Sequence, residues 1–380
     1  MKAFTSSSRI GESLHTMSRT LARWFPTPSL IFPRSAGIDV SDSSIKWLVL
    51  GEESGSGYRV ETYGEELLPE GVVVNGTIKD VEALGQILKK VKQRLPGIDC
   101  AHVALPEEAA YVFEMHVPEG VSRDEVLHMI EFEFEERVTI APEAAVFDFD
   151  RIQRHSGVGE EIGVVVFSRE FAETYVAAFE AAEITLLSLE IEARSIARAI
   201  SHGTENEPIT LLVDFGRART GFAVLKQGIP IFTSTVEIGG EAINRALTGK
   251  SSLSAYEAMV FKNEQGLLSS DSTKSPEQES IMKVASAFGD EIARHYHYWD
   301  TRRNEKGDQI TRVERIVLVG GSSNLNGLTE YIAGRVHAQT VYGDVWQNVC
   351  DFNEYIPPID RRTSLQYATA IGLALRSLPL

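Results

Sequence analysis

Two stretches of the sequence, Ala36-Gly-Ile-Asp-Val40 and Ile209-Thr-Leu-Leu-Val-Asp-Phe-Gly216, share one design. Each is an apolar run typical of a buried strand, and each carries an aspartate near its end, before small or polar residues. A second apolar run follows each polar turn, Ile45–Leu50 after the first and Gly221–Leu225 after the second. This strand–Asp–turn–strand unit therefore occurs twice, and an internal repeat of this kind predicts a fold with two similar halves.

The aspartates of the two units, Asp39 and Asp214, hold equivalent places in the repeat. Successive backbone N–H groups in such a turn form a concavity that binds phosphate. A carboxylate at a strand end suits a hydrated Mg²⁺, which takes few direct protein ligands. A third turn, Gly320-Gly321, follows the apolar strand Ile316–Val319. We therefore expect a nucleotide phosphate and Mg²⁺ between the halves, with the two aspartates facing each other across a cleft.

Composition limits the remaining possibilities. The 380 residues are enough for two lobes, and 43% hydrophobic with 24% charged residues is ordinary for a soluble globular protein. A net charge of −17 argues against nucleic acid as a partner. The isolated Cys100 and Cys350 form neither a disulfide framework nor a metal-ligand spacing. No apolar stretch reaches membrane-spanning length, and the N-terminus lacks a signal-peptide core, so we expect a cytoplasmic protein.

Residues 1–36 differ in charge from the rest of the chain, with five basic residues against one acidic residue. Apolar residues from Leu14 to Phe25 recur at helical spacing, and Pro26, Pro28 and Pro33 then end any helix. We expect a partly disordered tail that docks a few apolar residues on the body. The alternative is a basic amphipathic element that contacts a membrane surface or a partner.

The rest of the chain alternates between strand and helix patterns. A capping box at Ser122–Glu125 begins one helix, another at Ser254–Glu257 begins a second, and Gly239-Gly240 precedes a third. Residues 201–208 are typical of a linker, and the polar stretch 269–280 of a mobile loop. Further strands are predicted at 58–63, 102–105, 147–152, 162–167 and 186–190, and helices at 79–95, 122–138, 169–182, 193–200, 281–302, 325–336 and 364–376.

The order of these motifs resembles the actin superfamily. The similar segments are Asp39 to Lys46, Glu190 to Arg198, Asp214 to Thr220, Gly320 to Gly327 and Ala370 to Gly372. Within the superfamily, segments 130–142 and 189–198 are most similar to the PilM family of type IV pilus assembly proteins, which is related to the cell-division protein FtsA. The resemblance covers about 36–376. It implies an α/β, actin-like, two-lobed fold of the duplicated ribonuclease H type, with an FtsA/PilM-type extra subdomain.

The resemblance also implies a division of the chain after the 1–36 tail. The expected parts are the first lobe core at 37–104, the extra partner-binding subdomain at 105–187, a return to the first lobe at 188–208, the second lobe at 209–362 and a C-terminal helix on the first lobe at 363–380.

By the same resemblance, the cofactors are ATP and Mg²⁺. Asp39 and Asp214 serve the metal, and Asp214 is also the candidate catalytic residue, in what is at most a slow ATPase. The implied cofactor-binding residues are Asp39, Ser41, Ser43 and Lys46 in the first phosphate motif, Asp214, Gly216 and Thr220 in the second, Gly239, Lys262, and Gly320, Gly321 and Ser322 in the adenosine motif.

Three positions depart from the family pattern. Ser41 stands where the family has a glycine, which adopts a positive φ freely. Asp42 places a carboxylate where a phosphate-binding hydroxyl is expected, and this repels phosphate unless Mg²⁺ intervenes. Met259 replaces the expected ribose-binding glutamate, and Glu257 lies two positions before it.

The function that the resemblance implies is assembly of the type IV pilus at the inner face of the cytoplasmic membrane. The extra subdomain would hold the short N-terminal cytoplasmic peptide of a PilN-like inner-membrane protein, so that membrane contact is peripheral. Self-association into a homo-oligomer is left open. The alternatives are an FtsA-like, membrane-associated division protein and a small-molecule kinase or hydrolase on the same fold.

Four other signals are interpreted as structural. Thr248–Ser251 imitates the end of a P-loop but lacks its first glycine, so we assign it to a helix C-terminal loop. Gly157-Val-Gly159 is interpreted as a hairpin turn. His295 and His297 diverge at i, i+2 on a helix and are expected in a packed or interfacial aromatic face. The acidic run Glu131–Glu136 is expected on a solvated helix face.

Overall fold

The computed structural model describes residues 33–52, 57–152, 159–251, 253–268, 275–302 and 312–378. Most of the predicted tail, and part of the predicted hairpin turn at 157–159, lie outside these ranges. Within them, no helix combines the length and the apolar character that crossing a membrane requires.

The first lobe is built on a five-stranded sheet that contains the first strand–Asp–turn–strand unit. Its order is β10-β6-β1-β2-β3, with β10, β6 and β1 parallel and the β1–β2–β3 meander antiparallel. The bounds are β1 Ser35–Val40, β2 Ser44–Glu52, β3 Tyr58–Leu67, β6 Cys100–Leu105 and β10 Thr185–Ile191.

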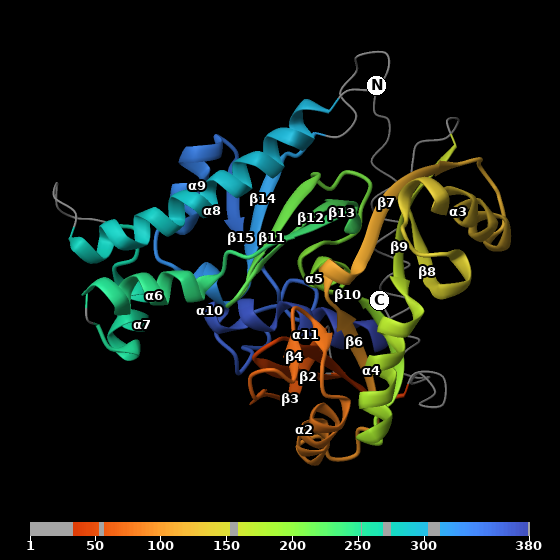
Figure 1. Ribbon diagram of the computed structural model, residues 1–380, viewed down its shortest axis with the longest axis horizontal. Helices are drawn as coiled ribbons and strands as arrows, with labels where there is room; N and C mark the ends of the chain where they lie inside the picture. Colours follow the sequence, from red (N-terminus) through yellow and green to blue (C-terminus); the bar gives the residue numbers. More distant parts are fainter. Residues whose placement is uncertain are drawn as a thin grey trace, which may run out of the picture.

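The second lobe repeats this sheet. Its order is β13-β12-β11-β14-β15, with β11, β14 and β15 parallel and β11–β12–β13 antiparallel. The bounds are β11 Thr210–Phe215, β12 Thr220–Lys226, β13 Ile229–Val236, β14 Arg315–Val319 and β15 Gln339–Tyr342. Each strand has a counterpart of the same direction in the first lobe, so the predicted internal repeat is confirmed as a duplicated topology (Figure 1).

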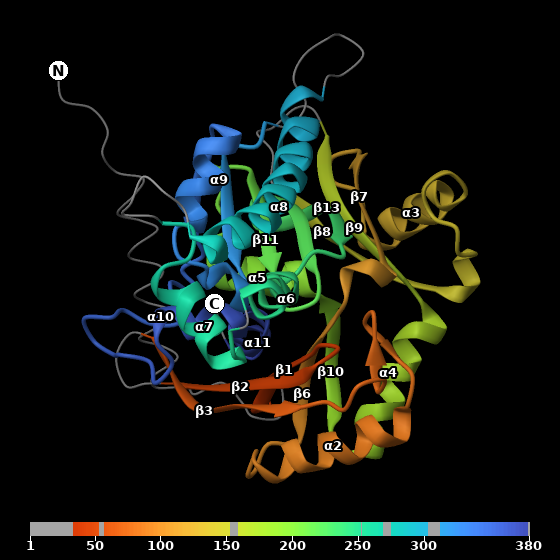
Figure 2. The same ribbon diagram turned by 60° about the vertical axis from the view of Figure 1, so that its left-hand side comes forward.

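Helices cover both faces of the sheets. In the first lobe, α2 (Val81–Gln93) packs against α4 (Arg169–Ala181) on the outer face, which is the lower side in Figure 2. On the other face, α5 (Glu192–Ile200) packs against α11 (Ala368–Ala374). The second lobe carries α6 (Gly240–Ser251), α7 (Ala255–Glu264), α8 (Pro276–Thr301), α9 (Leu328–Val336) and the short α10 (Arg361–Ser364).

The contact between α5 and α11 depends on a glycine. A Cβ built on Gly372 of α11 would lie 1.7 Å from the carbonyl oxygen of Ser195 in α5. On its other side, α11 contacts β1, where a Cβ on Gly37 would be 2.2 Å from the carbonyl oxygen of Ala370. These two close approaches fix the C-terminal helix between the first sheet and α5.

A third, smaller sheet lies apart from the two lobe sheets. Its antiparallel order is β7-β9-β8, with bounds β7 Ala110–Val117, β8 Ala145–Ile152 and β9 Glu160–Ser168. Helix α3 (Arg123–Arg137) begins at the predicted capping box and buries Val126, Ile130 and Phe134 against this sheet. Sheet and helix form the unit on the right of Figure 1, beside the second-lobe strands β12 and β13.

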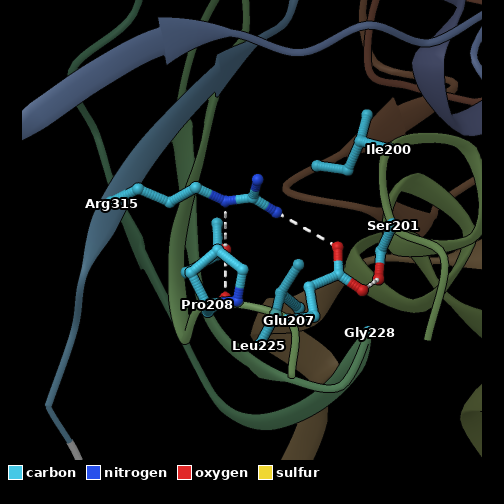
Figure 3. Close-up of a pocket in the computed structure, with 8 residues that line it drawn as sticks. Ile200, Ser201, Glu207, Pro208, Leu225, Gly228 and Arg315 are labelled. Carbon is cyan, nitrogen blue, oxygen red and sulfur yellow. Dashed lines mark hydrogen bonds and ion pairs between the residues drawn. The ribbon is translucent and has the colours of Figure 1, made fainter. Parts of the chain in front are cut away.

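The linker 201–208 between the lobes is held by polar contacts around a small pocket (Figure 3). Arg315 of β14 donates to the Thr210 hydroxyl at 2.8 Å and lies 3.2 Å from Glu207, which also accepts from the Ser201 hydroxyl at 2.6 Å. If the lobes rotate about this linker, these hydrogen bonds must either break or move together with it.

Several predicted boundaries are wrong. The last residues of the expected loop 269–280 begin α8, because Ser275 caps that helix and Pro276 occupies its first turn. Thr248–Ser251 forms the last turn of α6 instead of a loop. The predicted helix 364–376 is divided into α10, α11 and 3₁₀ turns. Strands β7, β13 and β15, and the two-residue pair β4 (Val73–Val74) and β5 (Thr77–Ile78), were not predicted.

Candidate functional site

Asp39 lies near the end of β1, in register with Lys46 of β2. Burial raises the pKa of the Asp39 carboxyl, and the charge of Lys46 opposes that rise only in part. The Lys46 Nζ donates to the Ser44 hydroxyl at 2.9 Å and lies 3.3 Å from Glu65. The structure therefore places one predicted metal carboxylate beside the predicted phosphate-binding lysine.

Asp214 occupies the matching place on β11, directly beside the third turn. Gly320, which follows the parallel strand β14, has a φ of +86°, and a Cβ on it would lie 2.3 Å from Asp214 Oδ1. Only glycine fits this approach. Burial, followed by the charges of Glu107 and Asp39, raises the pKa of Asp214 to about 7. The charge of Asp39 in the first lobe thus acts on Asp214 in the second.

The second phosphate turn, the Gly239-Gly240 turn and Ser322 form one hydrogen-bonded unit. Ser322 Oγ donates to the Gly216 carbonyl at 2.8 Å, and the Gly240 amide donates to the same oxygen at 3.0 Å. A Cβ on Gly239 would lie 2.3 Å from the Arg217 carbonyl oxygen. Segments separated in sequence therefore meet at this turn.

Hydroxyl groups of both phosphate turns are engaged within their own lobes. Thr220 Oγ1 donates to the Ile238 carbonyl at 2.5 Å. Ser41 Oγ donates to the Ser44 carbonyl at 2.9 Å and accepts from its amide at 3.2 Å. Ser41 does not adopt a positive φ, so the turn does not require the glycine that the family pattern has there. The carbonyl of Ser43 accepts from Leu68 at 2.9 Å.

Two glutamates that were not predicted belong to the same site. Glu107 follows β6 and Glu192 follows β10, the two strands parallel to β1. Their carboxyls are hydrogen-bonded to each other, and Glu107 also accepts from the Ala193 amide at 2.5 Å. Burial raises the pKa of both carboxyls, and the charge of Glu107 raises that of Glu192 further. Carboxyl ends of parallel strands meet at one sheet edge, which was the available signal in the sequence.

The negative charge of Asp42 is paired with a guanidinium. Its Oδ1 lies 3.0 Å from Nη2 of Arg219, which belongs to the turn of the other lobe. Arg219 also pairs with Glu108. The predicted repulsion of phosphate by Asp42 is therefore modified by a cation that the sequence did not place beside it.

Lys262 lies on α7 and contacts α6. Its Nζ donates to Asn244 Oδ1 at 2.6 Å, and burial lowers its pKa. Its carbonyl accepts from the Asn326 amide at 3.0 Å, in the segment that follows the Gly320 turn. Glu257 accepts from the Ser254 amide at 2.8 Å in a capping box, so it does not replace the glutamate missing at Met259.

The structure also shows where the residues that were interpreted as structural lie. His295 stacks on Phe222 with ring centroids 4.1 Å apart and planes at 3°, so it is packed as expected, whereas His297 is exposed. In the parts of the chain that the structure describes, no group of three or more His, Cys, Asp or Glu side chains is arranged to hold a metal ion. Glu131 and Glu136 are exposed on α3, as expected for a solvated face.

Comparisons with known proteins agree with this architecture. A chain of the solved "PilM-PilN type IV pilus biogenesis complex" superposes with a TM-score of 0.73 at 19% identity, over 92% of this chain and 100% of that chain. MreB5 of Spiroplasma citri bound to AMPPNP gives a TM-score of 0.51 at 13% identity, over 89% and 94% of the two chains. The MamK double helical filament gives 0.50 at 14% identity, over 90% and 99%.

At these identities the structural likeness establishes the fold, which is the predicted actin-like one. The model of the protein family described as type IV pilus assembly protein PilM matches residues 37–378, nearly all of the chain after the basic tail. The chain therefore belongs to the PilM family of type IV pilus assembly proteins.

Proposed function

We propose that this protein binds Mg-ATP between its lobes and thereby sets the angle between them during type IV pilus assembly. The observation that carries the proposal is the approach of Gly320 to Asp214, because a side chain at 320 would fill the space beside the carboxylate. Asp39 and Asp214 would hold the water ligands of Mg²⁺, which needs few direct carboxylates. Lys46 and the Gly216 turn would contact phosphate, while Gly320, Gly321, Ser322 and Lys262 would line the adenosine side.

Bound Mg²⁺ would supply positive charge that neutralises the phosphates. The chain's own residues favour binding over fast turnover. Glu107 and Glu192 share a hydrogen bond that requires a proton between them, and the raised pKa of each carboxyl favours keeping that proton. A carboxyl that holds its proton is a poor general base. The protein is therefore at most a slow ATPase.

The proposed partner is the short N-terminal cytoplasmic peptide of a PilN-like inner-membrane protein. One of the solved structures with this fold is a PilM-PilN complex. We assign the docking site to the extra subdomain, proposed at 105–187, because sheet β7-β9-β8 and α3 form a separate unit with its own core. Phe132 of α3 is 90% exposed there, which suits contact with an apolar peptide. This contact would hold the protein at the inner face of the cytoplasmic membrane.

Two titrations test these proposals independently. Calorimetric titration of Mg-ATP should give measurable heat with the wild type and none with Asp214→Ala, and equal negligible heats would make the protein a nucleotide-free scaffold. Titration of the PilN-like peptide should saturate at one site, and Phe132→Ser should weaken it while leaving Mg-ATP binding intact. A scrambled peptide that binds equally well would contradict the docking proposal.

A further inference from the structure

Arg219 joins the two lobes at the level of the two phosphate turns. It lies in the turn between β11 and β12, one residue before Thr220. Its Nη2 is 3.0 Å from Oδ1 of Asp42, in the turn between β1 and β2, and its Nη1 pairs with Glu108. The three side chains are 19% to 25% exposed, so solvent screens these pairs only in part. One guanidinium therefore bridges the phosphate turns of the two lobes.

Asp42 is surrounded by donors that suit an oxygen anion. Its Oδ1 also accepts from the Gly76 amide at 2.9 Å, and its Oδ2 accepts from the Asn75 amide at 3.2 Å. Gly76 is fixed in turn, because its carbonyl accepts from the Tyr175 hydroxyl at 2.7 Å. Backbone N–H groups and a guanidinium are the donors that phosphate-binding sites use. The carboxylate of Asp42 thus occupies donors that would equally suit a phosphate oxygen.

The position of this ion pair separates it from purely structural ones. Lys226 pairs with Glu161 at 2.6 Å, and Arg194 pairs with Asp150 at 2.7 Å, but both carboxylates belong to the extra subdomain, and Lys226 lies at the far end of β12 from the phosphate turn. Arg219 lies on the phosphate turn itself, where its carbonyl accepts from the Gly216 amide at 3.0 Å. A phosphate that enters between the turns must meet the Arg219 guanidinium.

We infer that Asp42 is a built-in competitor of the nucleotide's terminal phosphate for Arg219. Without nucleotide, the Asp42–Arg219 pair holds the two turns together. When a nucleoside triphosphate binds, its terminal phosphate takes Arg219 from Asp42, which keeps its bonds to Asn75 and Gly76. Arg219 is then the phosphate cation that compensates for the departure from the family pattern at position 42. This inference rests on the proposed function for its nucleotide, but not for its inter-lobe pair.

The inference predicts opposite effects from two variants that break the same bond. Asp42→Asn removes the competitor and one negative charge while Arg219 remains, so Mg-ATP should bind about tenfold more tightly. Arg219→Gln leaves the carboxylates of Asp42 and Glu108 without their cation, so Mg-ATP should bind about tenfold more weakly. If the pair served only to stabilise the fold, both variants would change the affinity for Mg-ATP in the same direction.

The inter-lobe pair is measured first without nucleotide. Urea unfolding of the wild type, Asp42→Asn, Arg219→Gln and the double variant gives a double-mutant cycle. Because both substitutions remove the same bond, their effects on the unfolding equilibrium constant should not be additive. The constant of the double variant should be at least about fivefold smaller than the value obtained by combining the effects of the two single variants. Arg217→Gln is the matched control: Arg217 pairs with Glu241 of its own lobe at 3.4 Å, so its effect should add to that of Asp42→Asn. Additive effects for Asp42 and Arg219 overturn the inference whether or not nucleotide binds.

Calorimetric titration of Mg-ATP into the same proteins then tests the exchange of partners. Tighter binding by Asp42→Asn with weaker binding by Arg219→Gln supports it, as does binding by Asp42→Asn when the wild type shows none. If the wild type binds and both variants shift in one direction, the inference is wrong while the proposed function stands. If none of the proteins binds Mg-ATP, the proposed function and the exchange of partners both fail. If the urea double-mutant cycle still shows coupling between Asp42 and Arg219, the two residues form a structural pair between the lobes and nothing more.

Discussion

Gly320 and Asp214 lie so close together that a Cβ on Gly320 would be 2.3 Å from Asp214 Oδ1 and 2.5 Å from the carbonyl oxygen of Phe215. The φ of +86° at Gly320 adds a conformational penalty for any side chain. Gly320→Ala should therefore displace this turn, destabilise the fold by about 1–3 kcal/mol and weaken Mg-ATP binding at least about tenfold. Urea unfolding and calorimetric titration measure the two effects.

Gly334→Ala is the matched control for that substitution. Gly334 lies in α9, and a Cβ there would meet nothing within 4 Å. Because alanine favours helix over glycine, this variant should gain about 0.5–1 kcal/mol and bind nucleotide as the wild type does. Equal losses of binding in the two variants would mean that the Gly320 turn is not part of the nucleotide site.

The raised pKa of Asp214 predicts a pH-dependent stability. Burial, then Glu107 and Asp39, raise this pKa from 3.8 to about 7, so the folded state keeps a proton that the unfolded chain has lost. Stability from this group therefore falls as the pH rises from about 4 to about 7. Asp214→Asn, which cannot ionise, should exceed the wild type in free energy of unfolding at pH 8 by about 1–3 kcal/mol, and by much less at pH 5. A difference independent of pH would contradict the raised pKa.

The predictable part of the site consists of residues next to strong local patterns. Asp39, Asp214 and Gly320 each lie at or just after the end of an apolar strand, and their order along the chain is that of a known superfamily. Such residues can be found from the sequence because the apolar pattern of the adjacent residues is enough to predict the strand that positions each of them. The duplicated sheet was predictable for the same reason, since both copies of the strand–Asp–turn–strand unit are local.

The position of Arg219 between the two phosphate turns was not predictable in this way. Arg219 meets Asp42, which is 177 positions away in the sequence, and no local pattern links the two turns. Strand β13 was missed because its second half, Thr233–Val236, is mostly polar. Its place in the sheet comes from pairing with β12, which is a tertiary effect that outweighs local propensity.

Glu190 should be a major determinant of how the C-terminal helix is held. Burial opposes its ionisation, but hydrogen bonds and charges from Arg198 and Arg376 outweigh burial and lower its pKa to about 2. Arg198 lies 2.6 Å and 2.7 Å from the two carboxylate oxygens and also donates to the Gly372 carbonyl of α11 at 2.9 Å. Glu190→Gln should cost about 3–5 kcal/mol at pH 7, because Arg198, which is only 11% exposed, loses the carboxylate that neutralises it.

The pH dependence of that loss has a defined sign. The pKa of Glu190 is depressed, so its stabilisation is fully present above about pH 4.5 and is lost as the pH falls towards 2. The difference between Glu190→Gln and the wild type should therefore shrink at pH 3, and amide hydrogen exchange in α11 should be faster in the variant at pH 7. Glu131→Gln, on the exposed face of α3, should change neither property.

Glu192 offers a way to separate nucleotide binding from turnover. Its carboxyl is hydrogen-bonded to Glu107, and burial followed by the charge of Glu107 raises its pKa well above the usual 4.5. In Glu192→Gln the amide can donate the same hydrogen bond to Glu107, so the fold and the affinity for Mg-ATP should be kept. Any ATP hydrolysis in which the Glu192 carboxylate itself accepts the proton should fall at least about 100-fold.

Single-turnover hydrolysis beside calorimetric titration measures the two properties on one preparation. Glu133→Gln controls for the loss of one carboxylate, since Glu133 pairs with Arg137 on α3, away from Glu107 and Glu192. If Glu192→Gln hydrolyses ATP as the wild type does, the pair is structural and hydrolysis depends on another group. If binding is lost with turnover, the nucleotide site depends on ionisation of the Glu192 carboxyl, because the glutamine preserves its shape and its hydrogen bond but cannot ionise.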